Sequence, residues 1–347
     1  MLLDGIFVPL TTPFSRDGRL YVPKLEHNVA RFSKTPAAGM IVLTASGEAS
    51  ALSDDETRDV LRVTAQVAAK EKVLIAGVSR DSVRGSLAVA EAAAAEEFDA
   101  VLAHAPCGGG LSAKETLVYF GALADASPLP LVLSSGTGAV ALDAVWVAEL
   151  ARHANVIGMV DSALTVPRYE ALVAAMAGVS REVVVTQVFA AATGRMLAVN
   201  GASAGALVPA DSLGYGKPAW TPAQAEPAIR TRTKKVGFQM LPAGSVDMLP
   251  LLLAGAAGAV PGLAACAPQA CHEVYAAWKD GDPALAAEKA ERISATTLLL
   301  NDELGVSGVK YAADLNGYYG GAPRLPRLPL DEAGRVRVEE AMRLLRN

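Results

Sequence analysis

His104 and Cys107 combine a base and a nucleophile at short spacing, just after an apolar run of the sequence. A thiol beside an imidazole can attack a carbonyl carbon while the imidazole takes the proton. With the carboxylate of Asp161, the same pair could hold a metal ion. Residues three apart in a loop need not face each other, so plain lining of a loop or pocket is the alternative, and no metal is predicted.

Two further groups invite a chemical interpretation. Cys266, Cys271 and His272 fall on a predicted helix, where the last two side chains point in different directions, so structural burial is favoured. The glycines at 108–110 precede Ser112 and resemble a phosphate cradle at a helix N-terminus. A flexible loop explains these glycines better, and we favour that interpretation.

The chain that positions these groups alternates short apolar runs with helical stretches. Apolar positions within the runs are continuous, as in strands buried on both faces of a parallel sheet. The nine candidate strands are residues 5–10, 39–44, 72–77, 98–105, 129–134, 155–160, 182–189, 237–241 and 258–263.

Helix-start signals follow several of these runs. Ser53 and Glu56 form a capping-box pattern, and Ser82, Ser112 and Asp143 each precede a helical stretch. Eight strand–helix units with short loops predict a (β/α)8 TIM barrel, with a doubly wound sheet as the alternative. No G-x-G-x-x-G follows the first strand, which weakens a dinucleotide-binding interpretation.

One candidate strand is surplus to eight units, and residues 189–236 break the rhythm. This stretch is rich in Gly, Ala, Ser and Pro, ends in a basic cluster that includes Lys234 and Lys235, and predicts an insertion before the seventh strand. It could be a functional lid or a loop that packs at an interface. The predicted domains are a barrel over 1–265 and a C-terminal helical extension over 266–347.

The composition excludes several classes of protein. The chain has 347 residues, of which 52% are hydrophobic and 19% charged, so it can bury a large core and is not globally disordered. A net charge of −5 and only 5% aromatic residues argue against nucleic acid as the main partner. The three cysteines, an odd and low count, suit a reducing cytoplasm.

A membrane location is not expected. The uncharged run 248–271 is long enough to cross a bilayer as a helix, but several prolines and glycines divide it. A buried helix followed by a buried strand explains this run better. The first residues carry an acid at Asp4 and no basic segment, which makes a poor signal peptide.

Five segments, taken in order, resemble the dihydrodipicolinate synthase / N-acetylneuraminate lyase family of class I aldolases. They are GIFVPLTTPFSRDGRL (5–20), TASGEAS (44–50), AGVSRDS (76–82), and the longer stretches 243–282 and 308–330. The resemblance implies a TIM barrel with a pocket at its C-terminal face and no cofactor. It also implies chemistry on a 2-oxo acid, often pyruvate, through a Schiff base on a sixth-strand lysine. The iminium stabilises a neighbouring carbanion as an enamine.

The positions that carry this chemistry in the family are altered here. The sixth strand of the family usually reads G-I-K-D/E-S-S, whereas residues 158–162 read G-M-V-D-S, so Val160 occupies the position of the lysine. Ser134 stands at the tyrosine of the L-Y-N-x-P run, and no arginine follows it. Gly108 occupies the position of a second tyrosine, which in the synthases reaches the active site of a neighbouring subunit. The resemblance therefore implies loss of the covalent machinery.

The carboxylate-binding part of the family pattern survives in part. Ser46, Gly47 and Glu48 match the T/S-G-E turn, while Ala45 replaces a hydroxyl residue. Val260 matches an aliphatic residue that lines the keto-acid pocket. The resemblance thus gives Ala45, Ser46, Gly47 and Val260 as substrate-binding residues.

Two functions remain open from the sequence. The first is an aldolase-like lyase that acts on a small 2-oxo acid or other carboxylate without an imine, with acid–base chemistry from Ser46, Ser134, His104 or Asp161. The second is a non-catalytic carboxylate-binding or scaffolding relative. The resemblance also implies a homo-oligomer, a dimer or tetramer, whose pockets are not completed across subunits.

Overall fold

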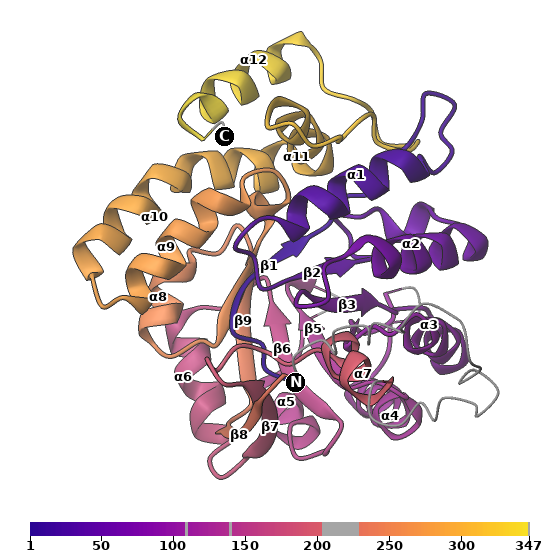
Figure 1. Ribbon diagram of the computed structural model, residues 1–347, viewed down its shortest axis with the longest axis vertical. Helices are drawn as coiled ribbons and strands as arrows, with labels where there is room; N and C mark the ends of the chain where they lie inside the picture. The colour runs from indigo at the N-terminus through magenta and orange to yellow at the C-terminus, as the bar shows by residue number, and fades with distance from the viewer. Residues whose placement is uncertain (108–109, 139–140, 203–228, 346–347) are drawn as a thin grey trace, which may run out of the picture.

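Eight parallel strands close into a barrel in a computed structural model that describes residues 1–107, 110–138, 141–202 and 229–345 (Figure 1). Their order around the barrel is β1-β10-β9-β6-β5-β4-β3-β2. The strands are β1 (Gly5–Pro9), β2 (Gly39–Val42), β3 (Val73–Gly77), β4 (Ala100–Ala103), β5 (Leu131–Ser135), β6 (Val156–Asp161), β9 (Gln239–Gly244) and β10 (Gly258–Pro261). The closed barrel confirms the predicted (β/α)8 fold.

Helices surround the barrel and begin where the sequence signals them. Ser53 Oγ accepts the Glu56 amide at 3.2 Å while Glu56 accepts the Ser53 amide at 3.0 Å, which completes a capping box. Ser82 and Ser112 also cap their helices, whereas Asp143 precedes its helix without a side-chain cap bond. The helices are α1 (Val22–Ser33), α2 (Asp54–Val67), α3 (Val83–Ala95), α4 (Ala113–Ala126), α5 (Ala144–Leu150), α6 (Val166–Ala175), α8 (Met248–Leu253) and α9 (Pro268–Lys279).

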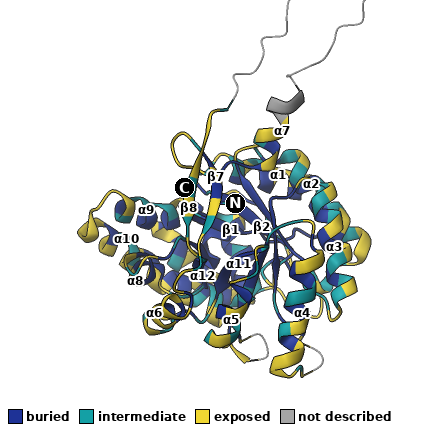
Figure 2. Ribbon diagram, turned by 90° about the horizontal axis from the view of Figure 1, so that it is seen from below, coloured by how far each residue is buried: buried dark blue, intermediate teal, exposed yellow. Residues whose placement is uncertain are grey.

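The barrel strands are buried on both faces, which explains why their apolar runs do not alternate. One apolar cluster packs between the strands and the helices, and Figure 2 shows the inner strands buried beneath the exposed outer faces of α3 and α4. A second cluster gathers side chains mostly from alternate strand positions, as expected for the barrel interior. It contains Leu3, Phe7, Ile41, Val73, Ile75, Ala100, Leu102, Val132, Ile157, Val160, Leu241, Ala243 and Val260.

The surplus strand candidate, 182–189, does not enter the barrel. Its residues form β7 (Arg181–Thr186), which pairs antiparallel with β8 (Thr231–Val236) in a separate two-stranded sheet. Val183 and Val185 are buried, but the Val184 between them is 46% exposed. The valine run therefore belongs to a strand with one face in solvent, a pattern that identical residue types conceal in the sequence.

The segment inserted before the seventh barrel strand docks at the N-terminal ends of the strands. It comprises β7, α7 (Gly194–Ala202) and β8, and residues 203–228 of the predicted insertion lie outside the described residues. The Gly194 amide donates to Asp99 Oδ1 at 2.8 Å, and Thr193 Oγ1 donates to the Lys70 carbonyl at 2.5 Å. Both acceptors precede a barrel strand. The described part of the insertion thus covers the end of the barrel opposite the predicted pocket.

The C-terminal helices lie together on one side of the barrel, next to α1 and α9 (Figure 1). They are α10 (Pro283–Leu298), α11 (Gly305–Leu315) and α12 (Glu332–Ala341). The uncharged run 248–271 is divided among α8, β10 and the start of α9. Among the described residues, no helix combines the length and the apolar character that crossing a bilayer requires.

Candidate functional site

Val160 occupies the barrel interior near the carboxyl end of β6. Its neighbours in register are Ser134 on β5 and Leu241 on β9. Val160 and Val260 are 6% and 5% exposed and belong to the same interior cluster. Parallel strands bring their carboxyl ends to one face of a TIM barrel, so Ser134, Val160 and Val260 lie at the face where such barrels bind ligands. Gly108 lies outside the described residues.

Asp161, predicted as a candidate for catalysis, is fully buried and already bound on both oxygens. Its Oδ2 pairs with Arg168 Nε at 2.8 Å, and its Oδ1 accepts the Ala163 amide at 2.8 Å. Arg168 Nη2 also donates to the Leu142 carbonyl at 2.6 Å and to Ser135 Oγ at 3.4 Å. The pair therefore ties β6 and α6 to the loop that follows β5, which is a structural role.

His104 and Cys107 lie close together, but not as a nucleophile and its base. His104 Nδ1 is 2.8 Å from the Ala105 carbonyl oxygen, which can only accept, so Nδ1 carries its proton. Cys107 Sγ is 3.7 Å from this same nitrogen, which therefore cannot take the thiol proton. Within the described residues, no group of three or more His, Cys, Asp or Glu side chains could hold a metal ion.

The other cysteines are structural, as predicted. Cys266 and Cys271 are fully buried, and burial raises the pKa of Cys266 to about 12 and that of Cys271 further still. Burial also lowers the pKa of His272. A thiol with such a raised pKa is protonated at neutral pH and unreactive.

The turn after β2, residues 44–48, packs tightly against the chain that follows β1. Thr12 Oγ1 donates to the Gly47 carbonyl at 2.6 Å. A Cβ atom on Gly47 would lie 3.0 Å from the Leu10 carbonyl oxygen, so this close approach favours glycine. The Gly47 amide donates to the Thr44 carbonyl at 3.0 Å.

Among the described residues, the donors of this turn that have no partner are the amides of Ala45 and Ser46 and the hydroxyls of Thr44 and Ser46. The Glu48 amide donates to the Ala45 carbonyl at 3.1 Å, so the amides on either side of the Gly47 carbonyl are occupied within the turn. The expectation that amides around Gly47 bind a carboxylate therefore narrows to those of Ala45 and Ser46. Neither of these amides, nor the partly exposed Ser46 hydroxyl, has a hydrogen-bond partner among the described residues.

Glu48, which ends the turn, is fully buried with two partners from the C-terminal part of the chain. Its Oε1 is 2.5 Å from Lys310 Nζ, and its Oε2 accepts the Arg324 amide at 2.9 Å. Desolvation lowers the pKa of Lys310, and the Glu48 carboxylate partly opposes this effect. Because Lys310 Nζ is buried against Glu48, it is not available as a substitute amine.

Arg324 also binds Glu56 at the start of α2. Its two terminal nitrogens contact the two carboxylate oxygens at 2.7 and 2.6 Å. The guanidinium holds the pKa of Glu56 at about 2, below its usual 4.5. Neither Arg168 nor Arg324 was identified from the sequence, where no motif marks either arginine.

Glu56→Gln is expected to lower the free energy of unfolding at pH 7 by about 1–2 kcal/mol, a value reduced for solvent screening. Because the folded-state pKa is depressed, the contribution of Glu56 is complete above pH 4.5 and is lost as the pH falls toward 2. Urea unfolding of both chains across this range measures the difference. The exposed Glu26→Gln serves as the control, and a constant difference between wild type and E56Q across the range would count against the ion pair.

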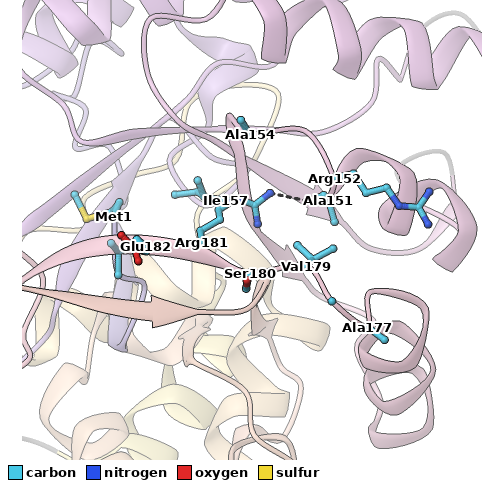
Figure 3. A pocket seen from close by; sticks show the side chains of 12 residues that line it. Met1, Ala151, Arg152, Ala154, Ile157, Ala177, Val179, Ser180, Arg181 and Glu182 are labelled. Atoms are coloured by element: carbon cyan, nitrogen blue, oxygen red, sulfur yellow. Dashed lines mark hydrogen bonds between the residues drawn. The ribbon is translucent and has the colours of Figure 1, made fainter.

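Two cavities lie at the opposite end of the barrel. One, of about 820 Å³, is lined by residues that precede β6 and β7, and Figure 3 shows Arg181 bonded to Ala151 at its wall. The other, of about 650 Å³, is lined by Lys234, Lys235 and the residues before β9 and β10. Both are formed in part by the insertion, and neither includes the residues at the carboxyl ends of the strands.

Comparison with known proteins identifies relatives along almost the whole chain. The sequence profile of the Dihydrodipicolinate synthetase family matches residues 2–185 and 229–344 and leaves out most of the insertion. A 4-hydroxy-tetrahydrodipicolinate synthase of Acidiphilium cryptum (strain JF-5) is 26% identical, with 98% of each chain covered. An L-threo-3-deoxy-hexylosonate aldolase of Hypocrea jecorina is 27% identical, with 98% of this chain and 95% of the aldolase covered.

Solved structures agree on the fold. The prophage protein YagE of E. coli K12, of the dihydrodipicolinic acid synthase family and in complex with pyruvate, has a TM-score of 0.76 at 21% identity, with 99% of each chain covered. A dihydrodipicolinate synthase of Acinetobacter baumannii complexed with pyruvate has a TM-score of 0.77 at 24% identity, with 98% of each chain covered. Together with the fold, these matches show that the chain belongs to the dihydrodipicolinate synthetase family.

Proposed function

We propose that this chain binds a small 2-oxo acid or related carboxylate at the C-terminal face of the barrel and does so without forming an imine. The observation that carries the proposal is that an aliphatic residue, Val160, and the donors of Ser46, which have no partner among the described residues, lie at the same end of the barrel. The pyruvate complexes of two structural relatives support a 2-oxo acid as the ligand.

The ligand is held by a few donors and an apolar wall. The Ser46 hydroxyl and amide bind the carboxylate, and hydrogen bonds to a charged group are stronger than neutral ones. Val160 and Val260 contact the carbon skeleton, which limits the site to a small acid. Ser134, beside Val160, supplies a hydroxyl to the 2-oxo group.

Any reaction at this site is of the lyase type, by acid–base steps alone. A carbanion next to the 2-oxo group then lacks the electron sink that an iminium provides, so turnover is slow compared with an imine-forming aldolase. A second candidate function, a carboxylate-binding protein without catalysis, is favoured by one observation. Asp161 and His104 Nδ1, two of the candidate acid–base groups, are both occupied by other partners.

Calorimetric titration with pyruvate and a panel of longer 2-oxo acids tests the proposal. We expect saturable binding that Ser46→Ala weakens about 10- to 100-fold, because a hydrogen bond to a charged group contributes about 1.5–3 kcal/mol. Ser50→Ala, in the exposed chain just beyond the turn, is the matched control and should bind like the wild type. No saturable binding by any acid would exclude the proposal. Measured cleavage of an aldol substrate would decide for the lyase over the non-catalytic relative.

A further inference from the structure

We propose that Lys310 and Arg324, both C-terminal to the barrel strands, are positioning residues for the ligand site, because they hold Glu48 and through it the turn that presents Ser46. The inference rests on the proposed function, since it concerns the same carboxylate-binding turn. Neither side chain reaches the ligand itself. The C-terminal extension thereby orients the carboxylate-binding turn in addition to packing against the barrel.

Glu48 adopts a backbone conformation that needs support. Its φ is 52°, in the left-handed region that residues with a Cβ rarely occupy. Such a conformation persists only where the surroundings impose it. Here they do so through the buried side chain, whose two carboxylate oxygens are held by Lys310 Nζ and the Arg324 amide.

Lys310 is itself fixed from several sides. Its side chain is fully buried, its Nζ donates to the Ala322 carbonyl at 3.2 Å, and the ammonium lies 4.4 Å from the centre of the Phe14 ring. A Cβ on Gly320 would lie only 1.9 Å from the Lys310 carbonyl oxygen, so the chain closes directly over this part of α11. The Lys310 ammonium therefore has a fixed position, and it fixes the position of the Glu48 carboxylate that pairs with it.

Arg324 also contacts the loop after β1. Its guanidinium carbon lies 4.2 Å from the centre of the Phe14 ring, and its nitrogens donate to the carbonyls of Gly18 and Ala51 at 2.6 Å each. The Phe14 ring thus contacts two cations from the C-terminal extension. We call Phe14, Glu48, Glu56, Lys310 and Arg324 the ionic clamp.

The clamp acts on the donors of the site through two residues of backbone. Ser46 precedes Glu48 by two positions, within one hydrogen-bonded turn that also packs on the loop after β1. When the Glu48 side chain is released, its left-handed backbone is no longer imposed. The Ser46 amide and hydroxyl then lose their common orientation, and the carboxylate is bound less tightly.

The decisive variant is the double substitution Lys310→Met with Glu48→Gln in the full-length chain. Removing one charge alone would leave its partner buried and uncompensated, whereas removing both avoids that cost. The control is Arg337→Met with Glu303→Gln, an exposed pair between α12 and the segment that joins α10 to α11, which does not touch the turn. Each chain is studied by thermal unfolding, by pyruvate titration and, without ligand, by hydrogen exchange of the 44–48 turn.

We expect the clamp variant to unfold near the wild-type temperature, to bind pyruvate at least tenfold more weakly, and to exchange the Gly47 and Glu48 amides faster. The control variant should match the wild type in binding and in exchange. Wild-type affinity or wild-type exchange in a folded clamp variant would overturn the inference. Faster exchange in a chain whose wild type binds no carboxylate would leave the clamp standing and overturn the proposed function.

Discussion

Val160→Lys is expected to turn the chain into one that forms a covalent adduct with pyruvate, trapped by borohydride as a stable secondary amine. The introduced amine would stand at the end of β6 among aliphatic side chains of the barrel interior. An apolar environment lowers the pKa of a lysine and leaves it neutral and nucleophilic at lower pH. The variant should lose about 2–4 kcal/mol of unfolding free energy, because it buries an amine in place of a methyl-bearing side chain.

Intact mass and peptide mapping after reduction measure this result. Val184→Lys, an exposed position on β7 at the other end of the barrel, is the matched control and should show only background labelling. A folded Val160→Lys chain that gains no carboxyethyl group on residue 160 after reduction would count against a 2-oxo acid site at this strand end. Restored aldol cleavage is not required, since the tyrosine positions of the family remain altered.

Arg168→Ala is expected to lower the free energy of unfolding by about 3–5 kcal/mol, because it leaves the fully buried carboxylate of Asp161 without its charged partner. The substitution also removes the bonds to Leu142 and Ser135 that hold the loop after β5. Urea unfolding at neutral pH measures the loss. Asp161→Asn combined with Arg168→Met, which removes both charges, should recover part of it.

The control for this experiment is Arg62→Ala. Arg62 forms an exposed pair with Asp59 on α2, with side chains 43% and 45% exposed, and surface pairs contribute at most about 1 kcal/mol. If Arg168→Ala cost no more than Arg62→Ala, the buried pair would not be a structural tie. Asp161 would then return as a candidate acid or base.

Much of the fold could be predicted because the burial of apolar strands, which drives its formation, leaves a pattern in short stretches of the sequence. Strands buried on both faces must be apolar throughout, and runs such as 72–77 and 155–160 satisfy that rule. The same rule failed at 182–189, where Val184 is apolar but faces solvent. Whether a valine is exposed depends on tertiary packing, which the residue type alone does not reveal.

The candidate site was predictable only where strand register fixes position. Val160, Ser134 and Val260 lie within apolar runs, so the fold gives their places on the strands, and the family resemblance singled them out as site positions. The electrostatic partners could not, since Arg324 lies 276 residues from Glu48 and no periodicity links them. For the same reason Asp161 was predicted as a candidate catalyst before its pairing with Arg168 was visible.

Borohydride reduction of the unaltered chain with saturating pyruvate is the most direct test of the central claim. Because an imine needs an amine and Val160 has none, we predict saturable binding of pyruvate and an unchanged intact mass after reduction. A stoichiometric carboxyethyl adduct that maps to one lysine, whether Lys310 or another, would contradict the claim. It would show that this barrel forms a Schiff base from a different position.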